Sequence, residues 1–281
     1  MSLDVQATGQ VGVKEAAGAL PAAKGASSAV AKPLVLAPPD ASVTTVLACA
    51  AATEKTCGAK ASAAGEISAL AAKQGAAGGF LAPPGCALPF GMQIGAALAS
   101  KGKYLRLAEA FDSAATKGQE ADVLAAEIRS FISTEWKVPA SAVAAVQKAF
   151  KAGARIMVRS SANCEDLQAI SGAGLYDSIA NVKSDDADAV SQAINRVWQS
   201  LWTKRAALSR RAAGMKHTEA AMGVLVQEMV AGDLSFIAFS SNPVNRDANQ
   251  VLCEGIHMTL GRCPLSIFCS RGTPPMSLSR P

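Results

Sequence analysis

Aromatic side chains make up only 5% of the 281 residues, and the chain has just two histidines. Its seven cysteines are odd in number and scattered, and no pair has the close spacing of a zinc site or a redox motif. The odd number and scattered positions of the cysteines argue against a disulfide framework. With only two histidines, they also argue against a cysteine–histidine metal centre. We therefore expect buried, unpaired thiols and a reducing compartment.

Long apolar runs and targeting signals are also missing. No uninterrupted apolar run reaches the roughly 20 residues of a membrane-spanning helix, and the N-terminus lacks the basic start and apolar core of a secretory signal. The first arginine is Arg106, so no Arg-rich transit peptide is evident. The formal charge of +5 is a mild excess, not the clustered basic stripe of a nucleic-acid-binding protein. We expect a soluble protein without nucleic-acid or membrane partners.

Half of the residues are hydrophobic, but alanine supplies much of that fraction and buries little area per residue. The core must therefore come from a few clusters of Val, Ile, Leu and Trp. A chain of 28.6 kDa is long enough for one large domain or for two lobes that share a cleft.

The amino-acid composition and the spacing of apolar residues change near Val43. Residues 1–44 are rich in Ala, Gly, Pro, Ser and Lys and predict a linker or a disordered arm. After it, apolar residues recur at helical spacing. The pattern predicts helices over about 57–73, from Met92 onward, over 104–113, over 120–133, and from an N-cap at Ser141 to Gly153.

The second half alternates strand-like and helical patterns. A strand is predicted over 155–159, followed by a polar loop to Ser178. A long helix capped by Ser184 or Asp185 and ending before Gly214 follows, and its core face carries Val190, Ile194, Val197, Leu201 and Leu208 beside Trp198 and Trp202. Three strand-like runs come next, over 223–228, 234–241 and 250–254, of which the first two are predicted to form a hairpin. Beyond Glu254 we expect irregular coil.

The segment 158–167 carries the most chemical information. An arginine leaves the strand into a loop of hydroxyls and small residues, and 171–176 adds two glycines. Such a loop lets backbone N–H groups approach an anion while a guanidinium grips phosphate oxygens. On the residues alone, an ordinary strand-to-helix loop is the favoured interpretation and a phosphate-binding loop the alternative.

The segment resembles part of the nucleotide-binding domain shared by pyruvate phosphate dikinase, phosphoenolpyruvate synthase and the glucan water dikinases. Arg159–Ala162 is similar to the family's Arg-Ser-Ser/Gly-Ala element, and Ser171–Gly174 to the glycine-containing loop that follows it. Gly58–Glu66 is similar to the family's Gly-x-Lys-x-x-x-x-Gly-Glu helix start, and Leu88–Met92 resembles its Pro-Phe-Gly turn.

Two later segments resemble the family in the same order. Val197–Ala206 is similar to the family's Trp-x-Ser-Leu-x-x-x-Arg-Ala helix, and Val224–Val230 to the strand beside its adenine pocket. Ser209–Gly214, with Leu234–Phe236, resembles the phosphoglucan water dikinase branch most. The resemblance covers roughly residues 55–254 and rests on five separated places in the correct order.

The resemblance implies roles for individual residues. Lys60 and Arg159 would neutralise ATP phosphates, whereas Gln227 and Glu228 would contact the adenine or its ribose, partly through backbone groups. The predicted ATP-binding set is Lys60, Arg159, Ser160, Ser161, Ser171, Gly172, Gly174, Gln227 and Glu228. Each has a plainer alternative, since Lys60 suits a solvated helix surface, and Gln227 and Glu228 suit the polar side of a strand. Glu165 and Asp166 would orient Arg159 by an ion pair or would merely cap a turn.

The sequence departs from the family at two places. The family passes a phosphoryl group through a histidine on a separate domain, but His217 and His257 match no such motif, and we expect both at the surface. The family's Gly-Leu-Gly-Glu turn and later acidic Mg²⁺ ligands are also not matched, because Thr259–Arg262 places a cation where an acid is expected. No catalytic residue is therefore assigned, the metal ligands stay unknown, and a gene fragment or a pseudoenzyme is implied.

The combined expectation is an α/β, two-lobed ATP-grasp-like nucleotide-binding domain, truncated at its C-terminus. Residues 1–44 would form the arm, 45–254 the domain with lobes of about 46–180 and 185–254, and 255–281 an irregular tail. The implied function is the ATP-binding part of an α-glucan (starch) dikinase, with ATP and Mg²⁺ as cofactors, glucan bound through other domains, and a plastid location. The alternatives are a non-catalytic nucleotide- or glucan-associated binding protein and a pyruvate-type dikinase or synthase fragment.

Overall fold

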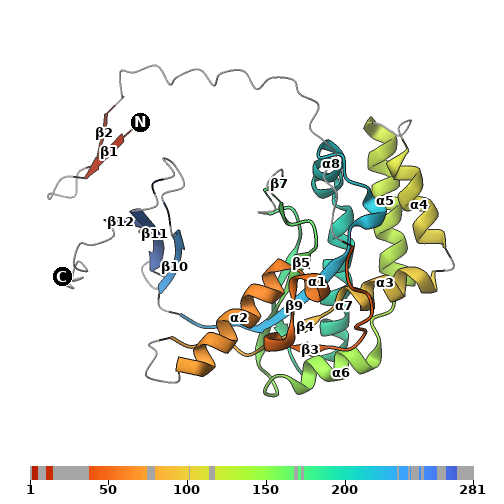
Figure 1. Cartoon of the computed structure of the whole chain (residues 1–281), viewed down its shortest axis with the longest axis horizontal. Helices are drawn as coiled ribbons and strands as arrows, with labels where there is room; N and C mark the ends of the chain where they lie inside the picture. Colours follow the sequence, from red (N-terminus) through yellow and green to blue (C-terminus); the bar gives the residue numbers. More distant parts are fainter. Residues whose placement is uncertain are drawn as a thin grey trace.

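A five-stranded antiparallel sheet forms the centre of the protein, as a computed structural model shows (Figure 1). Its strand order is β3 (Leu47–Ala48), β4 (Gly85–Leu88), β9 (Met222–Glu228), β5 (Arg155–Ala162) and β8 (Ser178–Lys183). The structure describes residues 2–5, 11–14, 38–74, 80–100, 102–113, 118–167, 170–171, 174–232, 234–239, 241, 247, 250–257 and 264–270. The sheet combines both predicted lobes, because β9 lies between β4 and β5.

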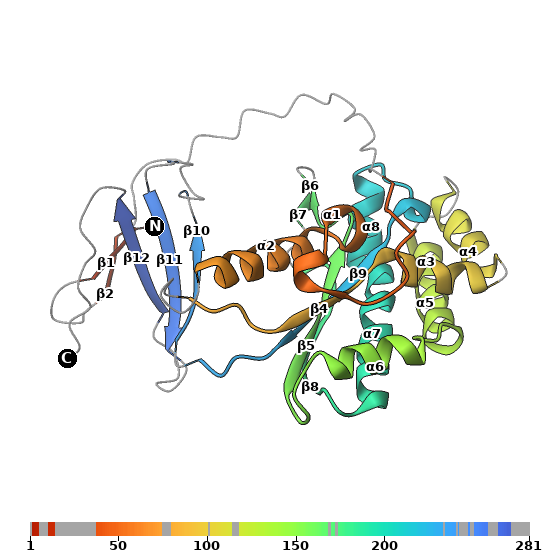
Figure 2. The same ribbon diagram turned by 60° about the horizontal axis from the view of Figure 1, so that its bottom comes forward.

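The two faces of the sheet carry different layers. Val224 and Val226 on β9 belong to the main core with the helices α3–α8, whereas Leu225 between them packs in a smaller cluster with α1 and α2. This alternation follows from the period of two in a strand. Figure 2 shows α2 on one side of the sheet and α6 and α7 on the other. The helices are α1 (Glu54–Cys57), α2 (Ala59–Gln74), α3 (Phe90–Ala99), α4 (Lys103–Asp112), α5 (Gly118–Glu135), α6 (Ala140–Lys148), α7 (Ala187–Gln199) and α8 (Lys204–Ala212).

The main core is built from the scarce large side chains. Trp198 and Trp202 are fully buried, and each meets another ring edge to face, Trp202 that of Phe111 and Trp198 that of Trp136. Aromatic pairs in this geometry contribute beyond their buried area. The predicted core face of the second-half helix is confirmed for its valines and isoleucine, but Leu208 is 41% exposed.

The prediction of one long helix over 184–214 is wrong, because a turn in the middle of this segment divides it into two helices. A 3-10 turn (η3, Ser200–Trp202) ends α7, and Thr203 adopts an extended ψ of 143°. The Thr203 side chain then accepts a hydrogen bond from the Ala206 N–H and starts α8. Asp186, and not Ser184 or Asp185, caps α7 by accepting from the Ala189 N–H. At α6 the predicted Ser141 cap is also wrong, since Pro139 precedes the first helical residue without a side-chain cap.

The predicted hairpin of residues 223–228 with 234–241 is wrong. All of Met222–Val226 is buried, so β9 suits the centre of a sheet, and β4 and β5 occupy both of its edges. β10 (Leu234–Phe239) instead pairs with β11 (Gln250–His257), which pairs with β12 (Pro264–Ser270). Part of the tail expected to be coil is therefore strand, and Leu265, Ile267 and Cys269 alternate along it with other residues.

Several further short segments in the described part of the chain are regular. In the arm, β1 (Ser2–Val5) pairs with β2 (Val11–Lys14), where the composition predicted no regular structure. β6 (Asp166–Leu167) pairs with β7 (Ile170–Ser171). The turns η1 (Cys49–Ala51) and η4 (His217–Glu219) complete the elements. Among the described helices, none combines the length and the apolar character that crossing a bilayer requires.

Four of the cysteines lie in the described part of the structure with resolved side chains. Cys49, Cys57, Cys86 and Cys164 are buried and unpaired, which confirms the expectation for these four. Burial raises the pKa of Cys49 to about 11 and that of Cys86 to about 12. Their thiols therefore stay protonated at neutral pH and act as small apolar groups.

Two helical glycines give a matched test of the packing between α2 and η1. A Cβ on Gly65 of α2 would lie 2.2 Å from the Cys49 carbonyl oxygen, whereas a Cβ on Gly95 of α3 would meet nothing within 4 Å. Alanine gains up to about 1 kcal/mol of helix propensity over glycine. We expect Gly95→Ala to raise the free energy of unfolding by up to this amount.

By contrast, Gly65→Ala should lower the free energy of unfolding by about 1–3 kcal/mol, because backbone must move to admit the methyl group. Urea denaturation followed by circular dichroism measures both changes. Shifts of the same sign in the two variants would contradict the close contact.

Candidate nucleotide site

The turn between α1 and α2 lies directly against the central strands. Thr53 and Thr56 form a capping box at the start of α1, and Gly58 turns the chain with a φ of +87°. A Cβ on Gly58 would lie 2.3 Å from the Ser161 carbonyl oxygen, and one on Gly223 would lie 2.3 Å from that of Cys57. Only glycine fits both positions, so these two residues let the turn touch β5 and β9.

Ser161 joins β5 to the first turn of α2. Its side chain is fully buried, and its Oγ accepts a hydrogen bond of 3.0 Å from the Ala61 N–H. That N–H is one of the donors that a helix start leaves without an intrahelical partner. The contact shown for Ser161 therefore docks a helix.

The same junction brings Lys60 to Glu165. The Lys60 ammonium contacts Glu165 Oε1, and its Nζ also lies 3.4 Å from Ser160 Oγ. The Glu165 side chain is 3% exposed, whereas that of Lys60 is 33% exposed. The pair therefore places a buried carboxylate behind an ammonium that a dissolved ligand can still reach.

Arg159 lies on β5, two residues before Ser161, and points to the α2 side of the sheet. Its Nη1 donates a hydrogen bond of 3.0 Å to Gln227 Oε1. The two residues are diagonal neighbours, since Arg159 is opposite Leu225 and Met157 is opposite Gln227. Of the two roles predicted for Glu165, orienting Arg159 or capping a turn, the contacts shown suit the turn, because the Ala162 N–H donates to Glu165 Oε2 at 3.5 Å. Glu165 also contacts Lys60, and Gln227 accepts the hydrogen bond from Arg159.

Glu228 follows Gln227 at the end of β9. Its backbone N–H donates to the Pro84 carbonyl oxygen at 2.9 Å. This N–H is therefore engaged by the protein itself, and the contact of Gln227 and Glu228 with adenine or ribose stays a prediction. The side chains of Gln227 and Glu228 are both half-buried.

The glycine-containing loop is described only in part. Ser171 is opposite Asp166 in the two-residue pairing of β6 with β7. Gly174 is exposed and has a φ of +71°, a conformation that favours glycine. Gly172 lies outside the described residues.

Two sets of contacts hold the turn that carries Glu165, and the sequence did not single them out. Asn163 donates from Nδ2 to the Glu219 carbonyl oxygen and accepts at Oδ1 from the Ala221 N–H, both at 2.9 Å. Cys164 Sγ lies 3.0 Å from the Tyr176 hydroxyl, which accepts a 3.2 Å hydrogen bond from Arg210 Nη1. Burial raises the pKa of both Cys164 and Tyr176, so both stay neutral.

Arg210 is 1% exposed, and its Nη2 donates to the Leu201 carbonyl oxygen at 2.5 Å. Among the residues that the structure describes, none accepts a hydrogen bond from its Nε. A buried cation with neutral partners is costly to desolvate, so each of its remaining hydrogen bonds matters.

His217 is not the surface residue that we expected. Its side chain is 1% exposed and stacks on Trp202, and its Nδ1 lies 2.5 Å from Asp112 Oδ1. His257 lies in β11 opposite Leu234, not in coil. The buried ring of His217 offers no nitrogen to a dissolved substrate.

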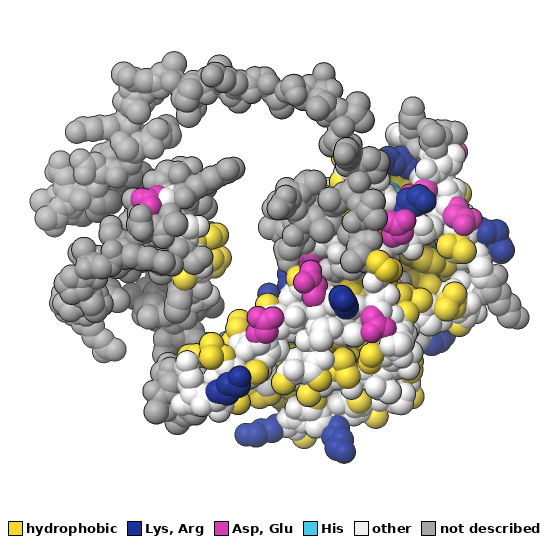
Figure 3. Space-filling model, in the orientation of Figure 1, with side chains coloured by type: hydrophobic (Ala, Val, Ile, Leu, Met, Phe, Trp, Pro, Cys, Tyr) yellow, Lys and Arg dark blue, Asp and Glu magenta, His cyan; other side chains and the backbone are white. Residues whose placement is uncertain are grey.

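Metal ligands are not grouped in the part of the chain that the structure describes. No three His, Cys, Asp or Glu side chains there converge on a common point. Residues 259–262, where a cation stands in place of the expected acid, lie outside the described residues. Charged side chains are also dispersed over the face drawn in Figure 3, without a basic stripe.

Substitutions of the two tyrosines test the contacts through Tyr176 and Arg210 that hold the turn carrying Glu165. Tyr176→Phe removes the partner of a buried cation, whereas Tyr104→Phe removes only the 3.2 Å acceptor of the neutral Trp202 indole N–H. We expect losses in the free energy of unfolding of about 1.5–3 kcal/mol for Tyr176→Phe and about 0.5–1.5 kcal/mol for Tyr104→Phe.

Chemical denaturation of both variants, monitored by tryptophan fluorescence, measures the difference. An equal or larger loss in Tyr104→Phe would show that Arg210 does not depend on the Tyr176 hydroxyl.

Comparison with known proteins assigns the chain to a family. The family described as "Pyruvate phosphate dikinase, AMP/ATP-binding domain" matches residues 56–261. Similar proteins include the phosphoenolpyruvate synthase of Aeropyrum pernix, 37% identical over 102 residues, which are 36% of this chain and 12% of that protein. The rifampicin phosphotransferase of Streptomyces sviceus is 39% identical over 125 residues, which are 43% of this chain and 14% of that protein.

A second rifampicin phosphotransferase, from Bacillus subtilis, is 40% identical over 87 residues, which are 31% of this chain and 10% of that protein. The chain thus spans a small fraction of the length of these relatives. They support the ATP-binding family and do not support the narrower assignment to glucan dikinases. Because the family match covers more than half of the chain, the chain belongs to the pyruvate phosphate dikinase AMP/ATP-binding domain family.

Proposed function

We propose that this chain binds ATP at the junction of α2 and β5 and forms the nucleotide-binding part of an ATP-dependent phosphotransferase. The observation that carries the proposal is the placement of Lys60. Its ammonium stands at the start of α2, backed by the buried Glu165 and one-third exposed. The family match supports ATP as the ligand.

The charges of the site suit a triphosphate. Lys60 adds a cation to a helix start, where unpaired N–H groups already favour anions. Arg159, held by Gln227, adds a guanidinium that suits paired phosphate oxygens. Ser160 and Ser161 are fully buried, so we expect them to hold Lys60 and the start of α2 in place and not to contact the nucleotide. Ser171, Gly172 and Gly174 complete the proposed set as the loop over the phosphates.

Mg²⁺ usually accompanies ATP, and it binds through one or two carboxylates together with the phosphates. Among the described residues, Glu165 contacts Lys60, and no three His, Cys, Asp or Glu side chains form a cluster that could hold the ion. We therefore assign no step of the reaction to a metal held by these residues.

The acceptor of the phosphoryl group is a finer proposal. An α-glucan acceptor is supported only by the resemblance of Ser209–Gly214 and Leu234–Phe236 to the phosphoglucan branch. The two-lobed ATP-grasp-like arrangement and the plastid location are also proposals that rest on the resemblance to the glucan dikinases. The similar proteins carry the names of a phosphoenolpyruvate synthase and of rifampicin phosphotransferases from archaea and bacteria.

Isothermal titration of ATP tests the nucleotide site with matched controls. Lys60→Gln should weaken binding about tenfold or more, because it removes one charged contact to phosphate. Lys73→Gln makes the same change at the far, exposed end of α2 and should leave the affinity unchanged.

The arginine has a control on its own strand. Arg159→Gln should weaken ATP binding by a similar factor, whereas Arg155→Gln, exposed and four residues earlier on β5, should not. Equal losses in each variant and its control, or wild-type affinity in Lys60→Gln, would refute the placement of the site.

A further inference from the structure

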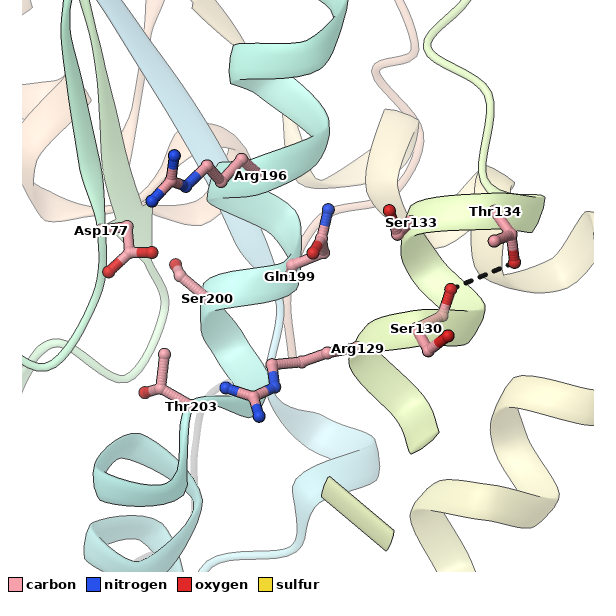
Figure 4. A pocket seen from close by; sticks show the side chains of 9 residues that line it. All are labelled: Arg129, Ser130, Ser133, Thr134, Asp177, Arg196, Gln199, Ser200 and Thr203. Atoms are coloured by element: carbon pink, nitrogen blue, oxygen red, sulfur yellow. Dashed lines mark hydrogen bonds between the residues drawn. The ribbon is translucent and has the colours of Figure 1, made fainter. Parts of the chain in front are cut away.

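A pocket of about 350 Å³ opens to solvent between α5, α7 and the segment after Gly174 (Figure 4). None of the residues expected to bind ATP lines it. Figure 4 shows the Arg196 side chain reaching from α7 toward Asp177, and the Arg129 side chain reaching from α5 toward Thr203. Ser200 lies between the two guanidinium groups.

The two arginines have unused donors. Within the part of the chain that the structure describes, neither Arg129 nor Arg196 makes a hydrogen bond or an ion pair with another side chain. Each guanidinium offers five N–H donors in a planar fork that matches an oxyanion. Arg129 is half-buried and Arg196 is exposed, so a dissolved anion can reach guanidinium groups from two helices in this pocket.

The hydroxyl groups of the pocket floor are already engaged. Ser200 Oγ donates to the Val197 carbonyl oxygen at 2.6 Å, and Thr203 Oγ1 donates to the Leu175 carbonyl oxygen at 3.1 Å. These bonds fix the floor and leave the guanidinium groups as the donors for a ligand. The floor is therefore pre-formed, which reduces the entropy lost on binding.

Asp177 decides which anion fits. An ionised carboxylate only accepts hydrogen bonds, so it repels a fully ionised anion and favours one that still carries a proton. Orthophosphate near neutral pH keeps at least one proton, whereas sulfate keeps none. A ligand that contacts Asp177 in this pocket would therefore be phosphate in preference to sulfate.

We propose that this pocket binds orthophosphate, with Arg129 and Arg196 donating to its oxygens and Asp177 accepting a hydrogen bond from its P–OH group. The proposal rests on the pocket alone, so it stands whether or not ATP binds at Lys60.

Nuclear magnetic resonance titration of the whole chain with inorganic phosphate and with sulfate tests the site. Phosphate should shift the backbone amides of 174–177 and 196–203, and it should bind about tenfold more tightly than sulfate. Arg196→Gln should weaken phosphate binding about tenfold, because it removes a charged donor pair. Arg106→Gln, an exposed arginine on α4 outside the pocket, serves as the matched control and should change nothing.

Asp177→Asn should bring the phosphate and sulfate affinities together, which a general loss of folding would not do. Circular dichroism spectra of all variants check that they remain folded. Equal binding of phosphate and sulfate by the wild type, unchanged phosphate binding in Arg196→Gln, or shifts confined to the amides of 58–62 would each overturn the proposal.

Discussion

The structure depends on a close backbone contact between the α1–α2 turn and strands β5 and β9. Gly58 and Gly223 make it possible, because a side chain at either position would collide with a carbonyl oxygen of the opposing segment. Ser161 then ties the first turn of α2 to β5. Everything proposed about the nucleotide follows from this contact, since it is what carries Lys60 to the end of the strand that holds Arg159.

The second constraint is the position of Glu165. A carboxylate that is 3% exposed needs a counter-charge and hydrogen bonds, and Lys60 with Ser160 supplies both. The turn that carries it is held through Asn163 on one side and through Cys164, Tyr176 and Arg210 on the other. Buried polar groups that are fully hydrogen-bonded favour a single arrangement. Because Arg210 lies on α8, the contacts that hold this helix also order the turn that carries Glu165.

The candidate site was more predictable from the sequence than the topology was. The resemblance to the family's motifs singled out Lys60, Arg159 and Gln227, whereas the residues by themselves pointed only to the loop after Arg159. The pairing of Lys60 with Glu165 spans 105 residues, and no local pattern encodes such a distance. β9 was expected beside β10 because hairpins join neighbours, but its complete burial required two partners, β4 and β5. The break at Ser200–Thr203 escaped notice because its apolar spacing stays helical, and His217 because burial of a lone histidine depends on a distant Asp112.

The most direct test is a crystal structure of the chain with a non-hydrolysable ATP analogue. The account predicts a phosphate oxygen about 3 Å from Lys60 Nζ, at hydrogen-bonding distance, with Arg159 on the same triphosphate. A nucleotide bound elsewhere, with Lys60 still engaged by Glu165 alone, would contradict the central claim.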